Sequence, residues 1–373
     1  MEYYDDMSKK IRVLIISYYY PPSKSVGAVR IGSLYSFLTK KGYEVDIMCF
    51  EDNSGRSKFE KNKINKKTTK KLKLSQYFRS IDKSIFSKFL IFNLKKTFIS
   101  KNNYDVVICS YKPISNIILG IFLKLRRKKT KLFIEFRDLI SQFGRKKRVL
   151  FFHKLDELID KFYIFFADEL ISVSPSSRIK AENFYNRKVH LIYNGFDFRK
   201  NYYKKPSDKI KILYAGTLSS VRNLKLITNH ILKSKLNIEL IIASNENPAQ
   251  FNGDFSFVNY IGFVSRKDLE NIIKEVNFLL ILEGFDKDSE ENIPAKLFEY
   301  LSYNKPIMAN CSLRSEIINI LNETNTGMNI NEYKNFEKLL KMDNFKVNEN
   351  IEFYSRENQF NTYENLINEN LKT

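Results

Sequence analysis

The feature that most constrains the fold is an alternation of short, β-branched apolar runs with longer stretches of helical spacing. The first run, "IRVLIIS" at residues 11–17, is followed by the turn signal Pro21-Pro22. A helical stretch over 27–41 and a second run, "YEVDIMCF" at 43–50, come next. Apolar runs without polar alternation are typical of strands buried on both faces of a parallel sheet. The order of strand, loop, helix and strand therefore predicts a doubly wound α/β sheet.

The same alternation continues through the chain in two successive blocks, separated by the polar stretch "RKNYYKKPSD" at 199–208. The first block adds apolar runs at 104–110, 131–137, 169–174 and 189–193. The second block has runs at 210–216, 238–244, 255–262, 277–283 and 305–310. We therefore predict two Rossmann-like domains, residues 1–200 and 207–348, that face each other across a cleft. A closing helix over about 350–373 is expected to pack back on the first domain.

The scarcity of cysteine and histidine argues against several kinds of site. Three cysteines, Cys49, Cys109 and Cys311, follow no disulfide or metal spacing, which suggests a reducing cytoplasm. With only three histidines, a histidine-built metal site is not expected. No apolar run approaches the roughly 18 residues that span a bilayer, and the polar N-terminal stretch is unlike a signal peptide. We expect a cytoplasmic protein that uses no cofactor.

The net charge of +21 is distributed unevenly. Residues 1–206 contain 44 Lys and Arg against 19 Asp and Glu, whereas residues 207–373 contain 19 against 23. This asymmetry suggests that the first half faces a polyanion, either a nucleic acid or an anionic membrane surface. Lysine enrichment in an AT-rich genome would explain it as well. No nucleic-acid recognition module is readable, so we expect no nucleic-acid partner.

Residues 56–101 are lysine-rich, with Phe, Leu and Ile interleaved at helical spacing. This pattern fits an amphipathic helix on an anionic membrane surface, and it equally fits a helix that covers the first sheet. The first interpretation would place the protein on the periphery of the membrane.

The stretch "SEENIPAKLFEYLSYNKPI" at 289–307 places two carboxylates around the start of a predicted helix. Glu291 precedes the helix and Glu299 lies inside it. A helix start with free N–H groups suits a phosphate, and the carboxylates could accept hydrogen bonds from sugar hydroxyls. The pattern matches a nucleotide sugar, with its hexose by Glu291 and its ribose by Glu299. On spacing alone, Glu291 could equally be an ordinary loop acid, and Glu299 could be a solvated position on the helix.

The tripeptide "DKD" at 286–288 has the form of a metal-binding D-x-D signature. It lies in an acidic loop rather than at the end of a strand of the first block. We interpret it as solvated charge and predict no metal at the site.

Six segments, in order from residue 11 to about 310, resemble the retaining glycosyltransferases of family 4, which have the two-domain GT-B fold. The stretch "EENIPAKLFEYLSYNKPI" resembles the E-x7-E signature of that family. The other five segments are "IRVLIISYYYPPSKSVGAVRIGSL", "FIEFRDLIS", "VHLIYNGFD", "ILYAGTLSSVRNLKLI" and "NYIGFVSRKDL". The resemblance implies a nucleotide-sugar donor, with a UDP-sugar favoured.

The resemblance assigns a donor site in the second domain. It places Glu291 beside the donor hexose, Glu299 on the ribose hydroxyls, and Arg222 on the diphosphate, where relatives have a lysine. Relatives often carry an arginine directly after the glycine matched by Gly216. This chain has Thr217 there and so one fewer cation for the leaving group. Further donor contacts are expected from the base-binding backbone near Phe263 and Val264, and from the loop residues Asn292, Ile293 and Pro294.

On the acceptor side, the resemblance points to the first strand-to-helix loop and to the end of a strand in the first domain. Gly27 and Arg30 are expected at an acceptor or phosphate loop. Arg137 and Asp138 could position the acceptor hydroxyl or the donor phosphate, or could form an internal salt bridge.

The implied reaction transfers a sugar with retention of configuration and without a metal. No enzymic nucleophile stands out, so the leaving diphosphate would take the acceptor's proton. The acceptor would be a lipid-linked or oligosaccharide acceptor in bacterial surface polysaccharide assembly, such as capsule or O-antigen, at the inner face of the plasma membrane. A nucleotide-sugar 2-epimerase of the same fold and a non-enzymatic polyanion-binding protein are the alternatives.

Overall fold

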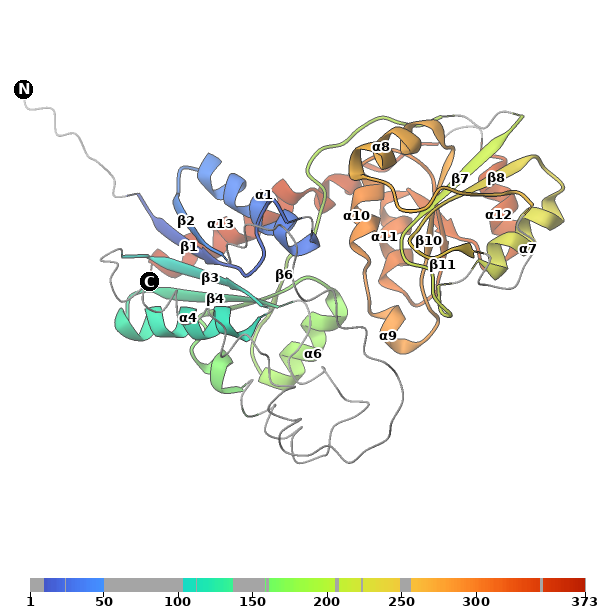
Figure 1. The fold of residues 1–373 in the computed structure, drawn as a ribbon. Coiled ribbons are helices and arrows are strands. Elements are labelled where there is room, and N and C mark those ends of the chain that lie inside the picture. The colour runs from blue at the N-terminus through green and yellow to red at the C-terminus, as the bar shows by residue number, and fades with distance from the viewer. Residues whose placement is uncertain are drawn as a thin grey trace, which may run out of the picture. The chain divides into compact units, whose positions relative to one another are not determined.

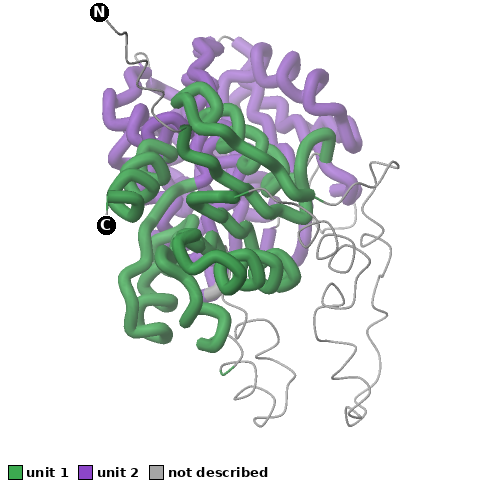
Figure 2. The backbone as a smooth tube through the Cα atoms, turned by 90° about the vertical axis from the view of Figure 1, so that its left-hand side faces the viewer, with its two compact units in different colours: residues 1–193, 360–373 green, residues 194–359 purple. Residues whose placement is uncertain are grey.

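The computed structural model describes residues 10–23, 25–49, 103–111, 113–136, 158, 161–204, 208–222, 224–248, 256–342 and 345–372. The chain forms two compact units (Figure 2). Unit 1 comprises residues 1–193 and 360–373, and unit 2 comprises residues 194–359. The predicted amphipathic stretch at 56–101 lies outside the described residues. The polar stretch at 199–208 falls within unit 2.

Unit 1 contains a six-stranded sheet in the order β2-β1-β3-β4-β5-β6, and every neighbouring pair is parallel. Each strand falls within one of the six apolar runs of the first block. The strands are β1 (Arg12–Ile16), β2 (Glu44–Met48), β3 (Val106–Ser110), β4 (Lys131–Phe136), β5 (Glu169–Ser172) and β6 (His190–Leu191).

Alternate residues of each strand in unit 1 pack into two separate cores. Val13 and Ile15 of β1 contact the core on one face of the sheet, whereas Leu14 and Ile16 contact the core on the other. Helices α1 (Val26–Lys40) and α13 (Arg356–Lys372) cover the first face, and α4 (Ile114–Arg126) and α6 (Pro175–Tyr185) cover the second (Figure 1). The apolar side chains of α13 from Phe360 onward complete the first core. Covering both faces explains why the strands read as continuous apolar runs.

Unit 2 contains a second parallel sheet in the order β12-β11-β10-β7-β8-β9. The sequence predicts five of these strands but not the sixth, β12, which has only three residues and contains a glycine. The strands are β7 (Ile210–Ala215), β8 (Ile238–Ala243), β9 (Val258–Tyr260), β10 (Phe278–Leu282), β11 (Ile307–Asn310) and β12 (Gly327–Asn329). Two parallel, helix-covered sheets confirm the predicted doubly wound α/β fold.

Helices cover both faces of the second sheet as well (Figure 1). Helices α7 (Lys225–Ser234) and α12 (Tyr333–Leu340) pack on one face, in the core that contains Ile227 and Phe336. Helices α10 (Ala295–Leu301) and α11 (Glu316–Thr324) lie on the other face. The remaining elements are α8 (Arg266–Glu275), the one-turn helix α9 (Lys287–Glu290) and the 3-10 helix η5 (Glu349–Tyr354). Among the described residues, no helix is both long enough and apolar enough to cross a membrane.

Candidate functional site

The candidate site lies in unit 2, where the two central strands of the sheet end. Strands β7 and β10 are neighbours although β8 and β9 separate them in the sequence. The strand order therefore reverses between them. Ligands of doubly wound sheets bind outside the carboxyl ends of the strands at such a reversal. Two segments meet there through contacts of Arg222 and Glu283: residues 216–222 follow β7, and residues 283–291, which include α9, follow β10.

Arg222 and Glu283 form an ion pair at these strand ends. Nε and Nη2 of Arg222 donate to Oε2 of Glu283 at 3.0 and 2.8 Å. The Glu283 side chain is only 2% exposed, whereas that of Arg222 is 34% exposed. A buried acid thus orients a cation that solvent and ligands can reach. Arg222, which the sequence predicts on the diphosphate, lies in the segment after β7 and reaches Glu283 at the end of β10.

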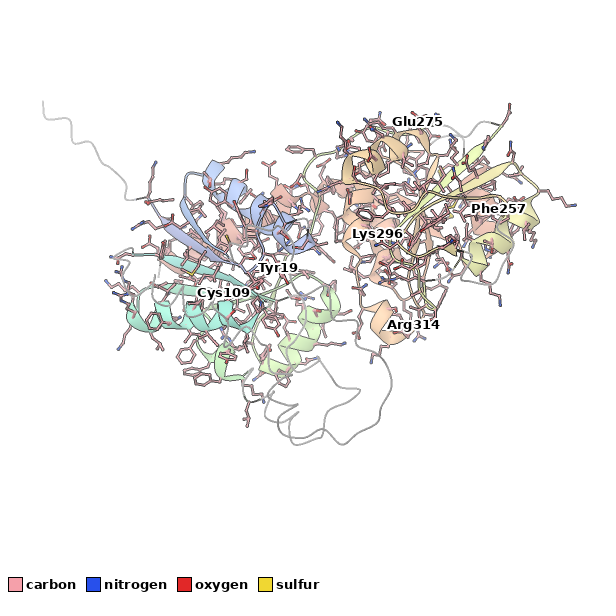
Figure 3. All side chains as sticks on the ribbon, in the orientation of Figure 1. Tyr19, Cys109, Phe257, Glu275, Lys296 and Arg314 are labelled. Carbon is pink, nitrogen blue, oxygen red and sulfur yellow. The ribbon has the colours of Figure 1, made fainter. Side chains whose placement is uncertain are left out.

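A second cation, Lys296, lies beside the same strand ends. It comes from the first turn of α10 and is labelled in Figure 3. Its Nζ lies 4.4 Å from the ring centroid of Tyr214 in β7. A Cβ added to Gly216 would come within 3.3 Å of the same Nζ. The sequence interpretation missed Lys296, although it stands inside the E-x7-E stretch.

The turn after β7 is fixed by side chains from within unit 2. Tyr214 donates its hydroxyl to the carbonyl oxygen of Thr217 at 2.7 Å. Glu246, which follows β8, accepts the backbone N–H of Leu218 at 3.2 Å. Thr217 itself is exposed. Gly216 has φ +153° and would meet both Tyr214 and Lys296 if it carried a Cβ, which explains why glycine suits this position.

Glu299 lies in α10 and is partly exposed. Its Oε1 accepts hydrogen bonds from the Tyr303 hydroxyl at 3.0 Å and from Nη2 of Arg266 at 3.4 Å. Burial and the nearby Glu299 carboxylate raise the pKa of Tyr303 well above its ordinary value, so the phenol stays protonated and donates. The carboxylate retains 30% exposure and can accept further hydrogen bonds.

The predicted sugar-contacting loop connects α9 to α10. Glu291 is the C-terminal cap of α9 and is half-buried. Asn292 is exposed, and Ile293 and Pro294 are half-buried. The helix α10 that follows is short, seven residues from Ala295 to Leu301.

Asp286 of the "DKD" tripeptide caps the N-terminus of α9. Its carboxylate accepts the backbone N–H of Ser289 at 3.2 Å and the Ser289 hydroxyl at 2.8 Å. Within the described ranges, no group of three or more His, Cys, Asp or Glu side chains could hold a metal ion.

The residues expected near the base follow β9. Phe263 is 77% exposed, Val264 is half-buried, and Gly262 before them has φ +68°. An exposed phenyl ring at a strand end offers a surface for stacking. Arg266, the cation closest to this loop in sequence, reaches Glu299 and so joins the expected base region to the expected ribose ligand within one unit.

The predictions for Gly27 and Arg30 need correction. Gly27 is not in a loop but is buried at the second position of α1, which starts at Val26. Arg30 is fully buried and cannot reach a phosphate. Its Nε and Nη2 bond Oε2 of Glu135 at 3.0 and 2.9 Å. Its Nη1 and Nη2 donate to the carbonyl oxygens of Tyr193 and Ile192. Arg30 is therefore a structural residue of unit 1.

The other two residues expected at the acceptor, Arg137 and Asp138, lie outside the described residues.

The sequence interpretation also missed Glu283, although the local sequence contains a feature that could have identified it. It follows five apolar residues at the end of the run "NFLLILE", so an acid is placed directly at the carboxyl end of a central strand. The burial of this acid could not be predicted locally, because its ion-pair partner, Arg222, is 61 residues away in the chain.

Residues 27–200 match the family model described as Glycosyltransferase Family 4. No match was found among curated protein sequences. The chain is similar in structure to the apo form of the lipopolysaccharide outer core galactosyltransferase WaaB, with 15% identity over 96% of this chain and 99% of that one and a TM-score of 0.60.

Two ligand-bound structures are similar as well. The catalytic domain of starch synthase IV from Arabidopsis thaliana, bound to ADP and acarbose, is 12% identical over 98% of this chain and 100% of that one, with a TM-score of 0.60. Anabaena HepE in complex with UDP and glucose is 10% identical over 97% of both chains, with a TM-score of 0.53. At these identities the structural matches establish the fold, and the family-model match supports glycosyltransferase activity. Together they confirm the resemblance of this chain to the family 4 glycosyltransferases of the GT-B fold.

Proposed function

We propose that the chain is a retaining, metal-independent glycosyltransferase that moves a sugar from a nucleotide sugar to a lipid-linked or oligosaccharide acceptor. The observation that carries this proposal is the meeting of Arg222 and Glu283 at the reversal of strand order in unit 2. A cation oriented there by a buried acid suits a diphosphate. Glu299, exposed in part on α10, supplies an acceptor for ribose hydroxyls.

In the proposed donor site, different residues bind the different parts of the nucleotide sugar. Arg222 binds the diphosphate, Glu299 the ribose and Glu291 the hexose, while the backbone near Phe263 and Val264 meets the base. Asn292, Ile293 and Pro294 contribute to the choice of sugar. HepE was solved with UDP and glucose, which supports a UDP-sugar as the donor.

In the proposed reaction the acceptor oxygen attacks the anomeric carbon from the face that the diphosphate leaves. The new glycosidic C–O bond forms as the bond to the diphosphate breaks, and the acceptor's hydroxyl proton passes to the departing phosphate oxygen. The negative charge that develops on the diphosphate is stabilised by Arg222, whose orientation is fixed before the reaction. The protein contributes positioning and electrostatic stabilisation and forms no covalent intermediate.

The proposed biological setting is bacterial surface polysaccharide assembly, with Arg137 and Asp138 at the acceptor. WaaB, similar in fold, acts on the lipopolysaccharide outer core, which supports an acceptor of this class. The excess of Lys and Arg in residues 1–206 suits an anionic membrane surface, where each nearby cation contributes about 1 kcal/mol. Co-sedimentation with anionic and neutral liposomes tests this part: salt-sensitive binding to anionic liposomes supports it, and equal recovery in both supernatants contradicts it.

The enzymatic proposal is tested by release of nucleoside diphosphate from a panel of UDP-, GDP- and ADP-sugars. The panel is incubated with and without lipid-linked saccharides extracted from bacterial membranes, and with and without EDTA. We expect release from one donor, stimulation by the extract, no effect of EDTA, and a product whose proton NMR coupling shows the donor's anomeric configuration. An inverted product would contradict the retaining mechanism, and loss of activity in EDTA would contradict metal independence.

A further inference from the structure

We propose that Lys296 is a second cation that, together with Arg222, binds the donor diphosphate. This inference rests on the proposed function and deepens it, because it assigns a binding group that no sequence motif indicates. The turn itself, "GTLSSV" at 216–221, carries no cationic side chain. The second positive charge at the end of β7 therefore comes from α10 rather than from the turn.

The position of Lys296 places its ammonium group where a phosphate would approach the backbone. Its Nζ packs against Gly216, so close that a Cβ there would lie at 3.3 Å. The Tyr214 ring, 4.4 Å away, holds the ammonium from the sheet side. Because the Tyr214 hydroxyl also fixes the carbonyl of Thr217, one side chain positions both the turn and the cation. The Lys296 ammonium group therefore lies next to the backbone of Gly216, which has no side chain of its own.

Among the residues that the structure describes, none accepts a hydrogen bond from Lys296 Nζ. No carboxylate lies within 4.0 Å of its Nζ, and no hydrogen bond to it is formed, among the described residues. The Oε2 of Glu283, an acid whose charge influences Lys296, accepts hydrogen bonds from Arg222. Its buried Oε1 has no hydrogen-bond partner in the described part of the chain. A half-buried ammonium group without an acceptor is costly unless a ligand supplies one. The oxygens of a diphosphate would do so.

Burial and two neighbouring charged groups shift the pKa of Lys296. Burial lowers the pKa of Lys296 to about 8, the Glu283 carboxylate opposes this shift, and the Arg222 guanidinium adds to it. An anion bound at the site would favour the ammonium and raise the pKa again. Above pH 8 the free site must therefore take up a proton in order to bind, and the affinity falls by up to about tenfold per pH unit.

The first test compares UDP affinity by calorimetry at pH 7 for the wild type, Lys296→Met, Lys296→Arg and Lys233→Met. Lys233 is a matched control, because its Nζ lies 4.3 Å from the ring of Tyr333 in the same kind of contact but on α7. We expect Lys296→Met to bind UDP about 10- to 100-fold more weakly. Lys296→Arg, which keeps the charge, should bind within a few-fold of wild type, and Lys233→Met should be unchanged. Uridine, which has no phosphate, should bind all four proteins alike.

The second test follows UDP affinity from pH 6.5 to 9. The wild type should lose affinity above pH 8, and Lys296→Arg should not, because guanidinium does not titrate in this range. Thermal unfolding without ligand shows whether each variant is folded. The pH comparison between the wild type and Lys296→Arg tests the proposal even if Lys296→Met does not fold.

The two proposals fail in different ways. If Lys296→Met binds UDP as the wild type does while Glu299→Ala does not, the role of Lys296 is overturned and the donor site remains. Equal pH dependence in the wild type and Lys296→Arg also overturns it. If the wild type binds none of UDP, GDP and ADP, the proposed function itself falls, and this inference falls with it.

Discussion

Arg222 donates both Nε and Nη2 to a single oxygen of Glu283, Oε2, at 3.0 and 2.8 Å. The acid is buried and the cation is partly exposed, so the acid fixes one edge of the guanidinium group. Arg222 is thereby held in one orientation before any ligand binds. In the proposed reaction, this preorganisation would let Arg222 stabilise the leaving diphosphate without ordering costs at the moment of reaction.

The ion pair predicts an unusual pattern of stability. Arg222→Ala removes the only hydrogen-bond partner that the buried Glu283 carboxylate has among the described residues, and should lower the free energy of unfolding by about 3 kcal/mol. Adding Glu283→Gln to that variant removes the uncompensated charge, so the double variant should be more stable than Arg222→Ala alone. Urea denaturation of the single and double variants measures both values. A double variant less stable than Arg222→Ala would show that Glu283 stabilises the unit by some other contact.

Arg222→Ala should also reduce turnover more than it weakens binding of the nucleotide sugar. Charge on the diphosphate grows as the glycosidic bond breaks, so the interaction with the cation is strongest in the transition state. We expect kcat to fall by about 10²- to 10³-fold with a smaller change in KM. Arg222→Lys, which keeps the charge, should recover part of the loss. If kcat stays at its wild-type value, another group stabilises the leaving diphosphate.

Glu299→Ala should weaken binding of free nucleoside diphosphate by about 10- to 100-fold, because the variant removes the acceptor for ribose hydroxyls. Calorimetric titration measures the change. Glu337→Ala is the control, since Glu337 pairs only with Lys341 one helical turn away on α12 among the contacts the structure describes. Equal affinities for Glu299→Ala and wild type would remove Glu299 from the site.

Arg30→Met should destabilise unit 1 without affecting the donor site. The change removes the guanidinium that pairs with the buried Glu135 carboxylate, at a cost of about 3–5 kcal/mol in the free energy of unfolding. Lys40→Met, an exposed change at the end of the same helix, should cost little. Nucleotide affinity, measured at a temperature where both variants are folded, should match that of the wild type. Specific loss of phosphate binding in Arg30→Met would restore its predicted role as a phosphate ligand.

Lys305 predicts a pH dependence of stability. It is 1% exposed and donates to the carbonyl oxygens of Lys274 and Val276 at the end of α8. Burial lowers its pKa in the folded protein to about 8, below the ordinary value of 10.5. Between these values the unfolded chain binds more protons than the folded protein, so the contribution of Lys305 to stability rises as pH increases from about 8 to 10.5 and is constant below pH 8.

The difference in unfolding free energy between the wild type and Lys305→Met isolates this contribution. We expect the difference to grow in favour of the wild type as pH rises from 7.5 to 10, measured by urea denaturation at each pH. A difference that is constant over this range would show that Lys305 titrates at its ordinary pKa.

The strands were predictable because a parallel strand covered on both faces must be apolar throughout, and such a run is visible without any other information. The strand β12 escaped prediction because three residues, Gly327–Asn329, cannot show a period. Its pairing with β11 depends on where the rest of the sheet lies. The position of Glu299 inside a helix was also predictable from local sequence.

The partners of charged side chains were not predictable. The family resemblance placed Arg30 at an acceptor or phosphate loop, yet the side chain is buried against Glu135 and Tyr363, 105 and 333 positions further along the chain. Lys296 is adjacent to the E-x7-E glutamates in sequence, but its role depends on Tyr214 and Gly216 from β7, far away in the chain. Such contacts depend on tertiary structure, which local patterns do not encode.

The measurement that tests the central claim most directly is thermal unfolding of the wild type with UDP, GDP and ADP, each paired with its monophosphate. A site built around two cations at the ends of β7 and β10 should favour the diphosphate of one base. A ligand at 100 times its Kd stabilises by about 2.7 kcal/mol, which raises the Tm by several degrees. We predict that one diphosphate raises the Tm clearly more than its monophosphate, and that Arg222→Ala abolishes this difference. Equal shifts for diphosphate and monophosphate, or no shift with any of the six nucleotides, would contradict the account.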